Sequence, residues 1–522
     1  MDPAAGAEAR TEAEAESQAE AEPDADSTAE VAAEPAPPAP ALTPVPVPVR
    51  AHAPSTVVAA SLTAGLAAAV LLPLDLPGLG WLLTGLVLTA LVWLVARRDR
   101  AEPLAWPERL VRGGWAALAL ALLAVGAFRD AGWLFTLCVL GAAAAGSLAV
   151  SGGRSVLGAV AVPVRAVGRM GWFVHGLAAV RVRGSRGRLL VSAVVSLLLL
   201  LVFGALFAGA DATFRELVSA ALPTVDGPGV VRGGFVFVVL TLGTAGACLV
   251  AVRGFREPSA GTVRRVGVLE WALPVGVLVV LFGGFVAVQL AALFGGEGYV
   301  RRTAQLTYAE YARSGFWQLS AVSVLALAVI AAAVRWAPRE HRAERVVLRV
   351  LPGALAVLTL VIVASAISRM LAYQEVYGST VLRLLVLTCE IWIGFVYLVV
   401  LAAGIRLRGA WVPRIAVASG LLVLVGLAAA NPEHLVAQHN VERGRVDLRY
   451  HGDLSADAVP ALLGLPQEDR ACLFPRFRNE LAYAEERGGW RAWNLSRSRA
   501  RSLLLAHADP SADCYRMSYR PR

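Results

Sequence analysis

The chain has 522 residues, of which 57% are hydrophobic and 17% charged, and its formal net charge is +9. Soluble domains average about 45–50% apolar residues, and here the excess is gathered in runs of 16 to 27 residues that hold at most one charge. A helix of about 20 such residues crosses a hydrocarbon core of about 30 Å. This composition excludes an ordinary soluble domain. It predicts an all-α, polytopic transmembrane helix bundle, that is, a multi-pass membrane protein.

The first 50 residues form a different kind of segment. They hold 11 acidic residues and two arginines, and they end in the proline-rich string "EPAPPAPALTPVPVPVR". Such a segment buries too little apolar surface to offset its ordering entropy, so we expect a disordered acidic tail. It either serves only as a solvated spacer or binds a protein partner. Because it lacks a basic start followed by an apolar run, no cleavable signal peptide is predicted.

About eleven spans are predicted between residues 51 and 430, with an uncertainty of one. Arg129 and Asp130 alone separate two of them, which predicts a tight antiparallel hairpin. The loop 151–188 has seven arginines and no acid, and it either lies on the inner leaflet or only sets the topology. The predicted spans are 55–72, 76–96, 113–128, 131–150, 189–208, 233–252, 268–294, 315–334, 350–368, 384–405 and 415–430.

The distribution of arginine predicts the orientation. The connections after the even-numbered spans hold 24 arginines, whereas the connections on the other side, with their borders, hold 8. Positive residues are retained on the cytoplasmic side of a membrane. We therefore predict a cell (inner, cytoplasmic) membrane protein with a cytoplasmic N-terminus and an extracytoplasmic C-terminus.

One polar and aromatic string, "QLTYAEYARSGFWQLSAV", stands at the predicted outer border of the eighth span. Tyr308 and Tyr311 are three positions apart and share a helical face, and Glu310 and Arg313 can pair at the same spacing. Tyrosine and tryptophan favour the headgroup layer. The string therefore predicts either an interfacial helix that seats the span or the edge of an outward-facing site.

Polar side chains inside nearby spans favour such a site. Glu390 lies about 9 Å into the tenth span, and Gln289 lies at a similar depth in the seventh. A charge in hydrocarbon requires a partner or a cavity, and Arg369 and Arg383 are the nearest guanidinium groups by depth. We expect Glu390 to form either an interhelical ion pair with one of them or a proton-coupled or ligand-facing carboxylate. The candidate functional cluster is Glu390, Arg369, Arg383, Gln289, Tyr308, Glu310, Tyr311 and Arg313.

Residues 431–522 hold 14 arginines and 12 acids and predict a small, soluble, extracytoplasmic helical domain. Ser455 and Asn494 are expected helix caps, and Pro460 predicts a kink or a late helix start. Cys472 and Cys514 are a possible disulfide pair if this domain lies outside the cytoplasm. The spacing of His434, His439 and His451 matches no known metal site.

Several strings in the chain resemble known proteins: "LFAGADATF", "LTYAEYARSGFWQL", "NPEHLVAQHNVERGRVDLRYHGDLSADAVPALLGL" and "WRAWNLSRSRA". They are similar to bacterial inner-membrane proteins grouped as domain of unknown function forty-one seventy-three and its relative forty-one fifty-three. The resemblance covers about residues 185–505 and implies a membrane protein without an assigned reaction. His451 stands where the family pattern has leucine. The matching positions are Asp211, Phe214, Tyr308, Glu310, Tyr311, Arg313, Asn431, Pro432, Asn440, Asp447, Tyr450, Ser455, Asp457 and Pro460.

Three functions stay open. The first is a non-enzymatic membrane protein that presents an external domain for signalling or envelope assembly. The second is a transporter or flippase that works around Glu390, and the third is a lipid-linked glycosyl transferase, for which Asp75 is the sole acid in the first outer loop. No nucleotide loop, zinc-protease helix or nucleophile elbow is present. We predict no catalytic, cofactor-binding or metal-binding residue; membrane lipids and proteins, not nucleic acid, are the expected partners.

Overall fold

The computed structural model describes residues 53–100, 103–153, 156–179, 227–253, 267–294, 316–407 and 409–507. The chain divides into the units Met1–Arg50 and Ala51–Arg522, and all described residues belong to the second. They are helical, with no strand in these ranges. The acidic tail, the fifth predicted span at 189–208, and Tyr308, Glu310, Tyr311 and Arg313 lie outside them.

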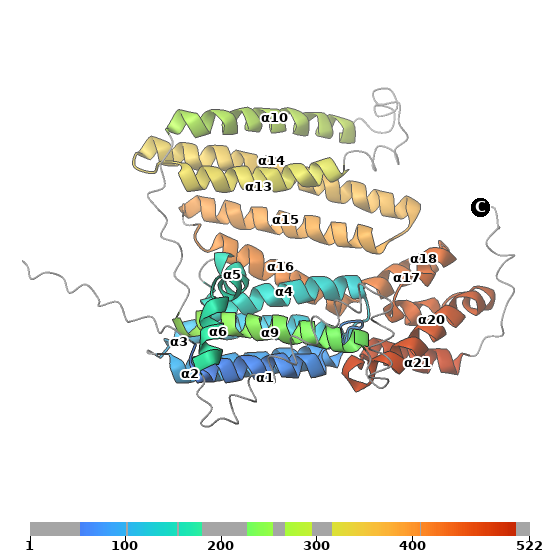
Figure 1. The fold of residues 1–522 in the computed structure, drawn as a ribbon. Helices are drawn as coiled ribbons and strands as arrows, with labels where there is room; N and C mark the ends of the chain where they lie inside the picture. The colour runs from blue at the N-terminus through green and yellow to red at the C-terminus, as the bar shows by residue number, and fades with distance from the viewer. Residues whose placement is uncertain are drawn as a thin grey trace, which may run out of the picture. The chain divides into compact units, whose positions relative to one another are not determined.

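Nine helices in the described ranges are long and apolar enough to cross a membrane, and α1 is a shorter apolar helix of 17 residues. Each predicted span except 189–208 coincides with one of these helices, so the polytopic helical bundle is confirmed (Figure 1). The helices are α1 (Ser55–Leu71), α2 (Leu79–Asp99), α3 (Trp106–Phe128), α4 (Gly132–Ser151), α9 (Gly227–Arg253), α10 (Val268–Phe294), α13 (Phe316–Trp336), α14 (Arg342–Tyr377), α15 (Val381–Arg406) and α16 (Val412–Ala430).

The chain runs back and forth between two ends of the bundle. The turns 72–78, 129–131 and 378–380, together with Asn431, lie at one end, which we call the domain face because the C-terminal helices follow it. The ends of α2, α13 and α15 and the starts of α3, α14 and α16 lie at the other end, which we call the arginine face. The predicted hairpin is confirmed, since α3 ends at Phe128 and α4 begins at Gly132.

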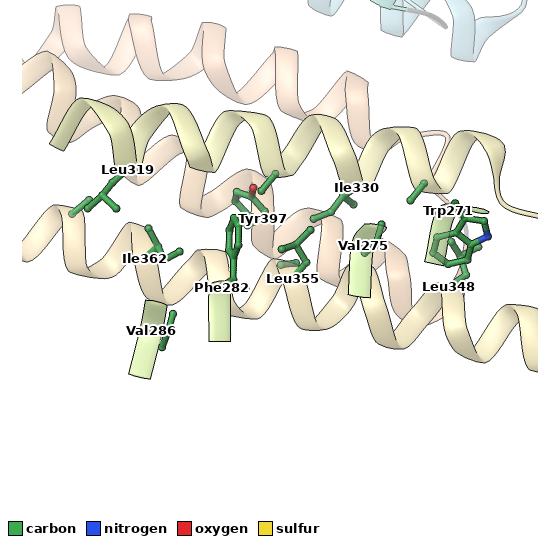
Figure 2. Packing of buried hydrophobic residues seen from close by; sticks show 14 of the residues in the cluster. Trp271, Val275, Phe282, Val286, Leu319, Ile330, Leu348, Leu355, Ile362 and Tyr397 are labelled. Atoms are coloured by element: carbon green, nitrogen blue, oxygen red, sulfur yellow. The ribbon is translucent and has the colours of Figure 1, made fainter. Parts of the chain in front are cut away.

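Two large apolar cores hold the helices together. One joins α3, α4 and α16 around Leu122, Leu134 and Leu421. The other joins α10, α13, α14 and α15, and Figure 2 shows its labelled side chains, among them Phe282, Leu355 and Tyr397, gathered between these helices. Burying apolar side chains cannot drive helix association in lipid, so close packing of this kind holds such a bundle together.

Some helices extend beyond the predicted spans. The helix α14 has 36 residues, about 54 Å at 1.5 Å per residue, whereas the expected span was 350–368. Its polar ends are rich in helix-forming Arg, Glu, Leu and Ala, so the helix continues past the apolar segment until Gly378, whose φ of +75° ends it. Consequently Arg369 lies two turns before the end of α14.

The arginine-rich loop 151–188 is partly helical where it is described. It contains the 3-10 helix η1 (Val156–Val160), α5 (Ala161–Gly168) and α6 (Met170–Ala179). Ser147 on α4 donates to the carbonyl of Gly158 and accepts from the amide of Val162, at 2.6 and 3.1 Å. These bonds fasten the start of the loop to the end of α4.

The C-terminal helices are α17 (Pro432–Glu442), α18 (Leu448–Gly452), α19 (Val459–Leu462), α20 (Gln467–Gly488) and α21 (Leu495–Ala506), with 3-10 turns η2 (Ala456–Ala458) and η3 (Trp490–Ala492). They share an apolar core around Phe474, Phe477 and Leu462. Ser455 and Asn494 cap their helices as expected. Pro460 lies in the first turn of α19, so the helix starts late.

Candidate functional site

A buried polar network joins the C-terminal helices to the turn between α3 and α4. One oxygen of Asp457, Oδ2, accepts from the backbone amides of Asp130 and Ala131, at 2.8 and 2.9 Å. Asp457 is 1% exposed, and Arg129 lies 3.9 Å from its other oxygen. Asp130 and Ala131 come directly before α4, so a side chain more than 300 positions away in the sequence satisfies the amides of the turn that leads into this helix. Asp457 therefore fixes the α3–α4 turn from the C-terminal helices.

Arg497 completes this network and ties it to a second turn. Its guanidinium pairs with the carboxylate of Asp130 and donates to the carbonyl of Pro77 at 2.6 Å. Leu79, the first residue of α2 after this turn, donates its amide to the carbonyl of Trp493 at 3.0 Å. One buried arginine on α21 therefore holds the α1–α2 turn and the α3–α4 turn together.

A third turn of the domain face, between α14 and α15, is held by α17 and α18. The side-chain amide of Asn440 accepts from the amide of Ser379 at 2.9 Å and donates to the carbonyl of the same residue at 2.8 Å. The hydroxyl of Tyr450 accepts from the amide of Val381 at 2.8 Å. The C-terminal helices thus contact the turns of helices from both apolar cores.

Glu433 is the other buried carboxylate of the network. It is 4% exposed and accepts from the indole of Trp133 at 3.0 Å and from the amide of Ser455 at 2.6 Å. Burial raises the pKa of Glu433 above its ordinary value of 4.5, although these hydrogen bonds lower it. Burial likewise raises the pKa of Asp130, against the lowering effect of Arg497. Desolvation outweighs the partners at both carboxylates.

We expect the raised pKa of Glu433 to make the junction more stable in mild acid. A carboxylate with a raised pKa binds more protons in the folded state, so its contribution to stability is complete below the ordinary value and is lost as pH rises through the folded pKa. The thermal unfolding temperature of the purified protein should therefore rise as the pH falls from 7 towards 4.5. Glu433→Gln should flatten this slope, whereas Glu480→Gln, at an exposed position on α20, should leave it unchanged; equal slopes in all three proteins would contradict the assignment.

Of the four residues of the predicted cluster that the structure describes, Gln289 and Arg369 contact each other. Glu390 is 2% exposed and accepts from the hydroxyl of Ser320 on α13. The expected ion pair is not made, because neither Arg369 nor Arg383 contacts Glu390. Its second oxygen, Oε2, is buried without a hydrogen-bond partner. The serine was not predicted, since a hydroxyl in an Ala-rich span gives no distinctive pattern.

The other predicted residues form separate contacts. The carbonyl oxygen of the Gln289 side chain accepts from Arg369 at 2.7 Å and from Ser365 at 2.8 Å. Arg383 donates to the carbonyls of Tyr377 and Gly378 at 3.2 and 2.5 Å, and it stacks on the ring of Tyr373. Gln289 and Arg369, both members of the predicted cluster, therefore contact each other, while Arg383 caps the end of α14.

The other residues considered as site candidates make contacts that stabilise the fold. Asp75 pairs with Arg232, so the acid of the first outer loop is engaged by α9. The ring of His451 is buried and bonds to the carbonyl of Asp447 at 2.7 Å. In the described part of the chain no three His, Cys, Asp or Glu side chains form a metal-binding group. Cys472 is disulfide-bonded; Cys514 lies outside the described residues, so their pairing stays a prediction.

The long apolar helices and the docked C-terminal helices define a multi-pass α-helical membrane protein. A family model for a domain of unknown function, DUF4153, matches residues 117–465. The chain belongs to this family, which confirms the resemblance to domain forty-one fifty-three. The relation to domain forty-one seventy-three and the bacterial source stay predictions. No curated protein and no solved structure matches the chain.

The described residues that carry the family resemblance gather at the junction. Asn440, Tyr450 and Asp457 bind the turns of the domain face. Asn431 caps α17, and its side chain also reaches the carbonyl of Asp457, at 3.5 Å. Sequence reasoning found these positions through their resemblance to a family. It did not find Asp130 or Arg497 as members of the junction, because Asp130 lies 327 positions from Asp457 and 367 positions from Arg497 in the chain.

Proposed function

We propose that the protein is a non-enzymatic membrane scaffold, in which the helical bundle holds the C-terminal domain in a fixed position for a protein partner in the cell envelope or for signalling. The observation that carries this proposal is that polar residues matching the family pattern bind the C-terminal domain to the bundle. Asn440, Tyr450 and Asp457 join the domain to the bundle through hydrogen bonds with backbone groups of its turns. A reacting site requires accessible groups, and this network has buried ones.

The proposed location is the cytoplasmic membrane, with the N-terminus in the cytoplasm and the C-terminal domain outside. The excess of arginine supports this orientation, because it lies on the connections opposite the domain face. The first and last membrane helices agree with this orientation, since α1 starts at the arginine face and α16 ends at the domain face. A reporter fused after Arg522 should be active outside the cytoplasm; activity inside would reverse the orientation.

The scaffold proposal is tested by crosslinking in living cells. A photoreactive residue replaces Tyr483 or Leu505, which are 53% and 72% exposed on the C-terminal helices. We expect a discrete crosslinked species with wild-type docking and its loss when Asp457→Ala releases the domain. The same substitutions at Leu462 and Phe474, in the core of the domain, are controls for nonspecific capture. Lack of any specific crosslink at exposed positions would argue against a scaffold.

Transport is the second candidate, and the surroundings of Glu390 favour it. No cationic side chain among the described residues pairs with this carboxylate, and one of its oxygens lacks a hydrogen bond. Buried ionisable groups within a membrane mark proton or substrate pathways in many transporters. A proton-coupled transporter would bind a proton at Glu390 on one side of the membrane and release it on the other.

Substitution of Glu390 separates the two candidates. If the carboxyl group is only structural, Glu390→Gln should keep the bond from Ser320 and leave abundance and phenotype unchanged. Glu390→Leu should then also be tolerated, because an apolar side chain replaces a poorly satisfied polar one. Normal abundance of Glu390→Gln with loss of a whole-cell uptake or lipid-translocation phenotype would instead identify a transporter. Ser365→Ala, beside Gln289, is the matched control.

A further inference from the structure

A large cavity opens at the arginine face, away from both sites described above. It has a volume of about 1270 Å³ and lies between α13, α14, α15 and α16. Ligand pockets for small molecules measure about 300–1,000 Å³, so this cavity has room for more than a small metabolite. Its walls are almost entirely apolar, with contributions such as Leu327, Ile330, Ala356, Val396 and Val400.

The polar side chains that line the cavity are all arginines. Arg335 ends α13, Arg339 lies in the connection 337–341, and Arg349 lies in the first turns of α14. No acidic residue lines the cavity, and none of the three guanidinium groups forms an ion pair within the described residues. The nearest acids along the chain are Glu340, which follows Arg339, and Glu344, and neither lines the cavity. Glu344 accepts from the amides of Glu340 and His341 at the start of α14. The mouth is therefore positively charged.

Two glycines give the cavity its width. A Cβ atom added to Gly353 on α14, or to Gly404 on α15, would meet no atom within 4 Å. Both residues line the cavity. Pro352, beside Gly353, also lacks the amide that would bind the preceding turn of α14. The helices therefore leave space next to the arginines that no side chain of the cavity wall fills.

We propose that this cavity binds a membrane lipid with an anionic phosphate headgroup, whose phosphate contacts Arg335, Arg339 and Arg349 and whose acyl chain enters the apolar part. The charge of the mouth selects the headgroup, because guanidinium groups bind phosphate oxygens by paired, charge-assisted hydrogen bonds. The apolar depth selects a lipid over free phosphate. Its location at the end of the helices places the arginines at headgroup level in the leaflet of the arginine face. This lipid site is independent of the proposed scaffold.

The site is tested on the purified full-length chain in neutral detergent. Phosphatidylglycerol, phosphatidylcholine with the same acyl chains, and inorganic phosphate are added separately, and bound lipid is measured by native mass spectrometry beside the shift in unfolding temperature. A ligand that binds the folded state alone raises this temperature. We expect binding and a shift with phosphatidylglycerol only. Equal shifts with both lipids, or a shift with phosphate alone, would overturn the proposal.

Two pairs of variants locate the binding. Arg335→Gln and Arg349→Gln should each weaken phosphatidylglycerol binding roughly five- to tenfold, whereas Arg342→Gln and Arg345→Gln, exposed on α14 outside the cavity, should not. Gly404→Leu should block the acyl chain, and Gly283→Leu, equally open but on α10, should not. Each shift is measured against the same variant without lipid, so a less stable variant remains informative. Loss of phosphatidylglycerol binding in the control variants too, or its retention in Gly404→Leu, would overturn the proposed site.

Discussion

Replacing Arg497 with alanine is expected to destabilise the docked C-terminal helices by about 3–5 kcal/mol, because it leaves the carboxylate of Asp130 buried without its cation. Arg497 is 9% exposed, and it also donates to the carbonyls of Pro77 and Ala492. Its loss therefore removes the contacts of α21 with two turns of the bundle at once. Hydrogen exchange of the amides of α21 in the purified protein measures this release directly.

The same helix supplies the control for this substitution. Arg501 lies one turn further along α21 and pairs with Glu485, but both side chains are more than half exposed. Exposed ion pairs contribute about 0–1 kcal/mol, so Arg501→Ala should leave exchange near the wild-type rate. If Arg497→Ala and Arg501→Ala behave alike, Arg497 does not hold the junction.

The effect of Arg497→Ala should also depend on pH. Burial raises the pKa of Asp130, and Arg497 is the cation that lowers it. Without this cation the pKa rises further, so the folded variant takes up a proton as the pH falls and relieves the buried charge. The destabilisation should be largest near neutral pH and should shrink towards pH 4. An effect that grows in acid would contradict this account.

The helices could be predicted because a span needs only a long apolar run. This signal is local and strong, and it located α2, α4 and α15 to within a few residues. It failed at the ends of α14, where polar helix-forming residues extend the helix beyond the apolar run. Only the backbone conformation of Gly378 ends it. A hydropathy pattern measures the hydrocarbon-compatible part of a helix and not its full length.

The polar contacts could be predicted much less well. The contact between Gln289 and Arg369 was not predicted, although both residues were assigned to the same cluster. The depth of Glu390 within its span did not identify its partner, which is Ser320 on α13. Depth does not specify which helix faces which. The contacts of Asp457 and Arg497 depend on how the C-terminal helices dock. That arrangement is a property of the assembled fold, and no spacing in the sequence encodes it.

Replacing Asn440 with alanine is the second substitution with a large expected effect, about 2–3 kcal/mol, because both the amide and the carbonyl of Ser379 lose their partner. Asn440→Asp should be nearly as harmful, since a carboxylate can accept from this amide but cannot donate to the carbonyl. Gln438→Ala removes only an exposed bond to Glu442 and serves as the control on α17. Hydrogen exchange of the α14–α15 turn is the measurement.

Combining Asn440→Ala with Arg497→Ala tests whether the C-terminal helices dock as one body. The two side chains share no partner, so independent contacts predict additive losses of stability within about 0.5 kcal/mol. A rigid domain predicts a different pattern of exchange. Asn440→Ala opens mainly the α14–α15 turn and Arg497→Ala mainly the α1–α2 and α3–α4 turns, while the double variant exposes all three turns of the domain face together. If a single substitution releases every turn, the contact that it removes is required for docking of the whole domain. Local opening even in the double variant would mean that the shared apolar core around Phe474 and Leu462 holds the helices without the polar network.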